Sequence, residues 1–222
     1  MRAVPAILIL TLILAPRITA ADRDEGDMFA TRSVVHARNG MVAAAHPLAV
    51  QIGLDVLKDG GTAVDAAIAV NAALGFLEPV ACGIGGDLFA LVWDAETEKL
   101  YGLNGSGRSP LALTADKVPA MPDGTIPVYS PYSWSVPGTV DGWFQLHGRF
   151  GKLPMKRILA PAIEAAEEGE PVPQVIAAAW ARSTRVFGEM PGFAPTFLPG
   201  GKPPATGEIF RNPGLARAYR LL

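Results

Sequence analysis

The clearest structural signal in this chain is the segment DGGTAVDAAIAVNAALGFL, residues 59–77. Its two glycines predict the end of one helix, because glycine readily adopts the left-handed conformation that closes many helices. Thr62 and Asp65 have the spacing of a capping box, so a second helix is expected from about 63 to 77. That helix is rich in alanine and apolar on most faces, which predicts a position inside the core.

Upstream of this segment, His46-Pro47 is expected to open a helix that runs to the two glycines. Further back, Asn39-Gly40 separates two short apolar segments, 33–38 and 41–45. Asn-Gly favours a type I′ turn, in which both central residues have positive φ. The sequence therefore predicts a β-hairpin here.

Downstream, the continuous apolar run Leu88–Trp93 is typical of a strand covered on both faces. A second strand over Lys99–Leu103 would complete another hairpin. The proline-rich stretch 110–137 predicts a long irregular loop that packs onto the body through three aromatic side chains: Tyr129, Tyr132 and Trp134.

The remainder of the chain is expected to be mainly helical. Prolines are common in the first turn of helices, so Pro154 and Pro161 predict the starts of two successive short helices. Further helices are expected over 138–150, 173–187 and 215–222, with a loop over 191–213. Helices and strands together predict the α+β class.

Composition excludes several classes of protein. Half of the 222 residues are hydrophobic and 18% are charged, which excludes disorder. The net charge of −2 gives no electrostatic reason to expect nucleic acid or an anionic membrane as partner. Cys82 is the one cysteine, so no intramolecular disulfide can form. The three histidines and Cys82 match no zinc spacing, so neither a metal nor a cofactor is expected.

Residues 1–21 have the layout of a secretory signal peptide. A positive charge at Arg2 precedes an apolar run over 6–15, and small residues follow at 19–21. Ten residues are too few for a helix to cross a bilayer. We expect cleavage after Ala20 or Ala21 and a secreted or periplasmic protein without a membrane contact after removal of the signal. The alternative is a retained membrane anchor.

Two segments are candidates for a functional site. Gly83–Gly86 precedes a strand instead of following one, which excludes the phosphate-binding loops, so close backbone approach or positive φ is the expected reason for its glycines. Asp87 then caps a turn or serves a site. Arg108 follows a predicted strand in a glycine-flanked loop, where a guanidinium suits a carboxylate; a solvated or structural arginine is the alternative. No catalytic residue is assigned.

Four motifs in order resemble the γ-glutamyltransferase (γ-glutamyltranspeptidase) family. Shorter matches follow at 152–154, 161–164 and 210–213. The four motifs are Asn39–Ala49, Asp59–Ala67, Gly83–Gly86 and Ser135–Val140.

The resemblance implies an N-terminal-nucleophile hydrolase, an αββα sandwich made as a precursor that cuts itself into a large and a small subunit. The new N-terminal threonine of the small subunit attacks a γ-glutamyl amide such as that of glutathione, and the acyl group passes to water or an amine. In the family this threonine lies in a Thr-Thr-His junction. Here the residues before the three histidines are Val35, Ala45 and Leu146.

Residues 22–222 are therefore expected to be the N-terminal portion of a large subunit, an incomplete domain that lacks the small-subunit strands. Alone it should be catalytically inert. Its partners would be the rest of the large subunit, the small subunit and a small-molecule amide. The final helix has no closing cap, which also indicates an incomplete chain; a frayed terminal helix docked on the body is the alternative. We expect isolated 22–222 to aggregate or to expose apolar surface.

The family's large subunit also supplies an Arg-Glu pair before Ala-Pro, whose arginine binds the substrate's α-carboxylate. Counted back from Pro110, that pair falls on Ser106 and Gly107, and Arg108 is displaced by two residues. We expect Arg108 to be the substrate-binding residue of a remodelled loop. This form resembles the divergent branch with cephalosporin-acylase-like amidases, one alternative function. A noncatalytic remnant or binding subunit is the other.

Overall fold

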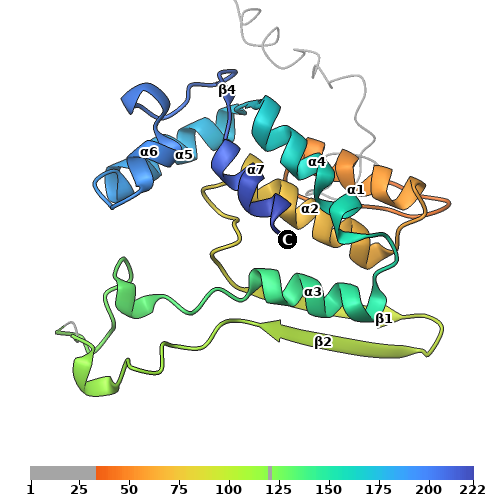
Figure 1. Ribbon diagram of the computed structural model, residues 1–222, viewed down its shortest axis with the longest axis horizontal. Helices are drawn as coiled ribbons and strands as arrows, with labels where there is room; N and C mark the ends of the chain where they lie inside the picture. Colours follow the sequence, from red (N-terminus) through yellow and green to blue (C-terminus); the bar gives the residue numbers. More distant parts are fainter. Residues whose placement is uncertain (1–33, 120–121) are drawn as a thin grey trace, which may run out of the picture. The chain divides into compact units, whose positions relative to one another are not determined.

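Helix α2 (Ala63–Leu77) is the most buried element of the fold, as its apolar faces predict. The computed structural model describes residues 34–119 and 122–222, so the expected signal peptide lies outside the described residues. Within the compact unit of residues 40–222, helices α1 (Pro47–Lys58) and α4 (Met155–Glu168) pack on α2, and α7 (Pro213–Arg220) packs on α4 (Figure 1).

The ends of α1 and α2 follow the local chemistry expected of them. Gly60 has a φ of +85° and ends α1. The Thr62 hydroxyl accepts a hydrogen bond from the Asp65 backbone N–H at 3.1 Å, and the Asp65 carboxylate accepts one from the Thr62 N–H at 2.8 Å. The predicted capping box is therefore confirmed.

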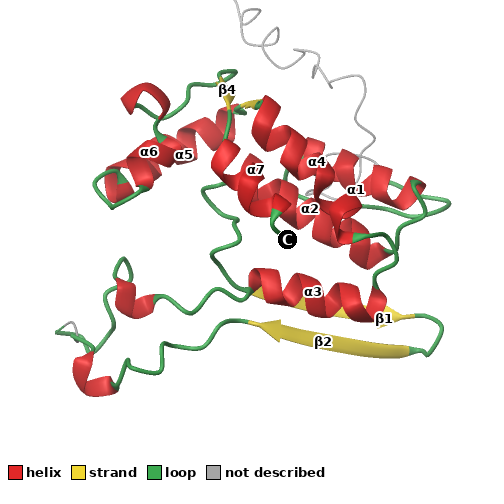
Figure 2. Ribbon diagram, in the orientation of Figure 1, coloured by secondary structure: helices red, strands yellow, loops and turns green. Residues whose placement is uncertain are grey.

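Strands β1 (Leu88–Asp94) and β2 (Lys99–Gly105) form an antiparallel hairpin that pairs Leu91 with Gly102. Helix α3 (Thr139–Phe150) packs on this hairpin (Figure 2). The expected hairpin is confirmed, but cover on both faces is not. Side chains of β1 alternate in burial, and the other face exposes Phe89, Leu91 and Trp93 by 66, 79 and 61%.

The remaining elements complete an α+β fold, as expected. Helix α5 (Gln174–Phe187) and the short helix α6 (Phe193–Phe197) lie next to one another in the chain. Strands β3 (Glu170–Pro171) and β4 (Ile209–Phe210) form a second small antiparallel sheet. The sequence indicates only loop over 191–213, because α6 and β4 are too short to give a periodic pattern.

Two further predictions are wrong. Residues 34–46 form no strand, and neither Asn39 nor Gly40 has the positive φ that a type I′ turn requires. The sequence predicts separate helices starting at Pro154 and Pro161, but α4 is one helix with Pro161 inside it. Proline removes one backbone hydrogen bond there, while the buried face of α4 continues through both halves.

The loop over 110–137 contains two short 3-10 turns, Ala115–Lys117 and Pro131–Ser133. Tyr129 packs edge-on against Phe187 of α5, with ring centroids 5.3 Å apart. Trp134 is 57% exposed, so packing of this loop through all three aromatic residues is not observed. Within the described ranges, no helix has both the length and the apolar character needed to span a bilayer.

Candidate substrate-binding site

Arg108 lies on a loop that follows β2, and its side chain is exposed. The Arg108 carbonyl accepts a hydrogen bond from the Val136 N–H at 2.9 Å, which joins this loop to the segment before α3. Among the described residues, the three ion pairs do not include Arg108. Its guanidinium can therefore offer its forked donors to an anion in solution.

The backbones of the two joined segments are in direct contact. A Cβ atom on Gly107 would lie 1.4 Å from the Val136 carbonyl oxygen, and one on Gly138 would lie 1.9 Å from that of Gly105. No side chain fits at either position. Glycine is required at 107 and 138 because the two chain segments approach so closely.

Asp87 links the same segments. Its Oδ1 atom accepts hydrogen bonds from the Ser135 hydroxyl at 2.7 Å and from the Gly107 N–H at 3.2 Å. The bond from the Ser135 hydroxyl and then that from the Gly107 N–H hold the pKa of the Asp87 carboxyl below its usual range. The sequence predicts either a turn cap or a site residue at position 87. The structure shows that the Asp87 carboxylate links distant segments beside the Arg108 loop.

The glycine-rich segment before Asp87 contributes its backbone. The Gly86 carbonyl accepts hydrogen bonds from the Gly138 and Thr139 N–H groups, both at 3.1 Å, and from the Thr139 hydroxyl at 2.8 Å. Gly83, Gly85 and Gly86 do not have positive φ, so that expected use of these glycines is wrong. Close approach is observed at Gly83, whose Cα would lie 3.5 Å from a Cβ atom on Gly75.

The structure therefore brings together Arg108, Gly83–Gly86 and Ser135–Val140, which are far apart in the sequence. Sequence reasoning missed Asp87 and Ser135 as partners. Asp87 directly precedes β1, and Ser135 lies four residues before α3. A short polar side chain just before an element is more often a local cap. Arg108 is exposed, and its role in substrate binding stays a prediction.

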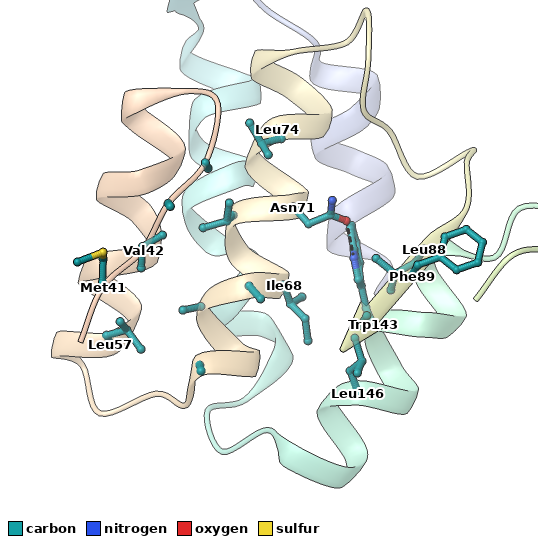
Figure 3. A pocket seen from close by; sticks show the side chains of 17 residues that line it. Met41, Val42, Leu57, Ile68, Asn71, Leu74, Leu88, Phe89, Trp143 and Leu146 are labelled. Atoms are coloured by element: carbon teal, nitrogen blue, oxygen red, sulfur yellow. Dashed lines mark hydrogen bonds between the residues drawn. The ribbon is translucent and has the colours of Figure 1, made fainter. Parts of the chain in front are cut away.

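A cavity of about 470 Å³ lies beside α2 (Figure 3). Met41 and Val42, in the segment before α1, line one side, and Leu88 and Trp143 line the other. Its walls are almost wholly apolar. The Trp143 indole N–H donates a hydrogen bond to Asn71 Oδ1 at 2.9 Å. The described residues include no group of three or more side chains suited to hold a metal ion.

The model of the family described as gamma-glutamyltranspeptidase matches residues 49–222. The chain belongs to the gamma-glutamyltranspeptidase family. It is 35% identical over 189 residues to glutathione hydrolase proenzyme of Bacillus subtilis, and the match covers 83% of this chain and 32% of that protein. The chain thus spans about a third of the length of this relative.

Two solved structures that resemble the chain agree with this assignment. The cephalosporin acylase of Bacillus halodurans is 43% identical, with a TM-score of 0.78 over 91% of this chain and 39% of the acylase. The gamma-glutamyltranspeptidase of Helicobacter pylori is 28% identical, with a TM-score of 0.78 over 85% of this chain and 55% of that chain. The resemblance inferred from the motifs is therefore confirmed.

Proposed function

We propose that this chain is the N-terminal part of a secreted amidohydrolase of the gamma-glutamyltranspeptidase family that binds the carboxylate of an acyl amide through Arg108. The observation that carries this proposal is the exposed Arg108 guanidinium on a loop whose backbone is held from both sides. A planar guanidinium forms two parallel charge-assisted hydrogen bonds with a carboxylate, which both orients and binds the acyl group.

The reaction itself needs residues beyond those of this chain. In the proposed mechanism the N-terminal threonine of a small subunit attacks the amide carbon, and its own α-amine accepts the hydroxyl proton. An α-amine has an unperturbed pKa of about 7.7 to 8.0, which suits a base near neutral pH. The amine product leaves, and water or an acceptor amine then releases the acyl group. The chain alone is expected to be inert.

Two features support a missing partner that completes the fold. The apolar cavity beside α2 has about the volume of several side chains, and the outer face of β1 exposes Phe89, Leu91 and Trp93. Apolar surface of this kind is normally covered in a stable protein. We propose that strands of the small subunit and the rest of the large subunit cover both, which completes an αββα sandwich.

The acyl group is proposed to differ from that of glutathione. Arg108 stands two residues from the position expected for the family's arginine, and a cephalosporin acylase is 43% identical to the chain. A dicarboxylic acyl group such as glutaryl offers a carboxylate without an α-amine. It would satisfy a site in which this one arginine is the anchor.

The test is kinetic, in the protein completed by its remaining segments. Glutaryl-p-nitroanilide and γ-glutamyl-p-nitroanilide carry a carboxylate, whereas butyryl-p-nitroanilide does not. Arg108→Ala should raise KM for the first two by roughly 10- to 100-fold, the range for a hydrogen bond to a charged group, and leave butyryl hydrolysis unchanged. Lys117→Ala, also an exposed cation on a loop, is the control. Equal loss on all three substrates would remove Arg108 from carboxylate recognition.

The absence of any amidase activity from the completed protein would favour the other function considered, a noncatalytic binding subunit. Secretion is part of the proposal and is tested separately. The N-terminus of exported protein, measured by mass spectrometry, should be Ala21 or Asp22. Protein that keeps Met1 and sediments with membranes would support a retained anchor instead.

A further inference from the structure

The Asp87 carboxylate lies where three chain segments meet: the start of β1, the loop after β2 and the segment before α3. One of its oxygen atoms accepts hydrogen bonds from both of the other segments, at 2.7 Å from the Ser135 hydroxyl and 3.2 Å from the Gly107 N–H. Gly107 directly precedes Arg108 in the chain. The hydrogen bond to Asp87 therefore fixes the peptide group from which the arginine projects.

The contact on the other side of Arg108 completes this arrangement. The Val136 N–H donates to the Arg108 carbonyl at 2.9 Å, and Ser135, which donates to Asp87, is the neighbouring residue. Hydrogen bonds and covalent links thus close a ring through five residues: Asp87, Gly107, Arg108, Val136 and Ser135. Removal of the carboxylate would leave the ring held by a single backbone hydrogen bond.

We propose that Asp87 is the positioning residue for Arg108. The inference rests on the proposed function, in which Arg108 binds the carboxylate of the substrate. Asp87 acts through the backbone and not as a counter-ion, since no ion pair joins it to Arg108 among the described residues. The guanidinium keeps its charge and donors for the ligand, while the loop that carries it is held in one conformation.

This arrangement has a physical advantage for binding. An arginine on a free loop loses both loop and side-chain conformational freedom when it binds a ligand. A loop that is already fixed loses only that of the side chain. Loss of the Asp87 link should therefore weaken binding of a carboxylate without changing the reaction step, which a separate nucleophile performs.

Amide hydrogen exchange in the protein completed by its remaining segments tests the link directly. Asp87→Ala should raise exchange of the Gly107 and Val136 amides by about tenfold, the lower range for hydrogen bonds to a charged group. Asp94→Ala is the matched control at the other end of β1, because Asp94 also accepts from a backbone N–H and a hydroxyl, those of Glu96 and Thr97. Unchanged exchange in Asp87→Ala would overturn the inference.

Kinetics of the completed protein test the consequence. Asp87→Ala should raise KM for glutaryl-p-nitroanilide about three- to tenfold with kcat unchanged, and Asp87→Asn, which keeps an acceptor oxygen, should restore most of it. In an Arg108→Ala background the Asp87 substitution should have no further effect. An equal effect in both backgrounds would overturn the positioning role. An Arg108→Ala variant with wild-type KM would instead overturn the proposed function. The exchange experiment would still test the Asp87 link, because it does not depend on substrate binding.

Discussion

The buried carboxylate of Asp65 accepts a hydrogen bond from the Lys152 backbone N–H, with 3.1 Å to each carboxylate oxygen. It also accepts from the Leu153 N–H at 3.2 Å and from Thr62 at the start of its own helix. Asp65 is fully buried. One side chain thus caps α2 and also fixes the turn between α3 and α4. The start of α2 and this turn are separated by more than eighty residues in the sequence.

We expect Asp65→Ala to lower the free energy of unfolding by about 3 to 5 kcal/mol, because it leaves three backbone N–H groups near the core without an acceptor. Urea denaturation followed by circular dichroism measures this. Asp55→Ala, which removes an exposed carboxylate on α1, should leave the free energy of unfolding nearly unchanged. A loss below about 1 kcal/mol in Asp65→Ala would contradict the assigned role.

The sequence predicted only the local half of what Asp65 does. A capping box needs residues three apart, so Thr62 and Asp65 reveal it directly. The contact with Lys152 depends on how two distant segments pack, and no spacing along the chain records that. The same limit applies to Asp87 and Ser135, which flank different elements and meet only in the folded protein.

Gly75 illustrates a second relationship that pattern analysis cannot reveal. A Cβ atom at this position of α2 would lie 2.7 Å from the hydroxyl of Tyr219, which donates to the Ala72 carbonyl at 2.9 Å. Alanine normally favours a helix interior over glycine by about 1 kcal/mol. Here the clash should outweigh that gain, because the Tyr219 side chain is buried and cannot move freely.

We therefore predict that Gly75→Ala destabilises the protein by about 1 to 3 kcal/mol, measured by urea denaturation. Tyr219→Phe removes the clashing hydroxyl and should cost about 1 kcal/mol by itself. The double variant should be more stable than the sum of the two single effects indicates. Simple additivity would show that the hydroxyl is not what excludes a side chain at position 75.

The exposed face of β1 leads to a prediction for the chain studied alone. Phe89, Leu91 and Trp93 are adjacent on one face, and the two-stranded sheet also has unpaired edges. Such surfaces associate in water. Purified residues 22–222 should bind a hydrophobic dye and self-associate in size-exclusion chromatography.

Replacement of Leu91 and Trp93 by threonine should reduce both signals in that chain. Leu111→Thr is the control, because Leu111 is fully exposed but isolated on a loop. A monodisperse wild-type monomer that melts cooperatively without dye binding would contradict the prediction. The apolar run at 88–93 predicts burial of both faces, but among the described residues α3 covers one face only, because a run of apolar residues does not specify which segment provides the cover.

His46 should make stability depend on pH. It is the N-cap of α1, where its Nδ1 atom accepts a hydrogen bond from the Leu48 N–H at 3.2 Å. Nδ1 can accept only in the neutral ring, so protonation removes the cap. Burial lowers the pKa of His46, although the carboxylates of Glu78 and Glu170 oppose this shift.

The sign of the effect follows from that shift. Below about pH 6.5, the ordinary pKa of histidine, the unfolded chain binds a proton that folded His46 does not. Stability should therefore fall as the pH is lowered from about 7.5 towards 5.5, and the melting temperature should fall with it. His46→Asn keeps a good N-cap acceptor without a titrating ring, so it should have a flatter profile. His36→Asn, at an exposed histidine, should keep the wild-type profile. Parallel profiles for wild type and His46→Asn would show that this cap does not sense pH.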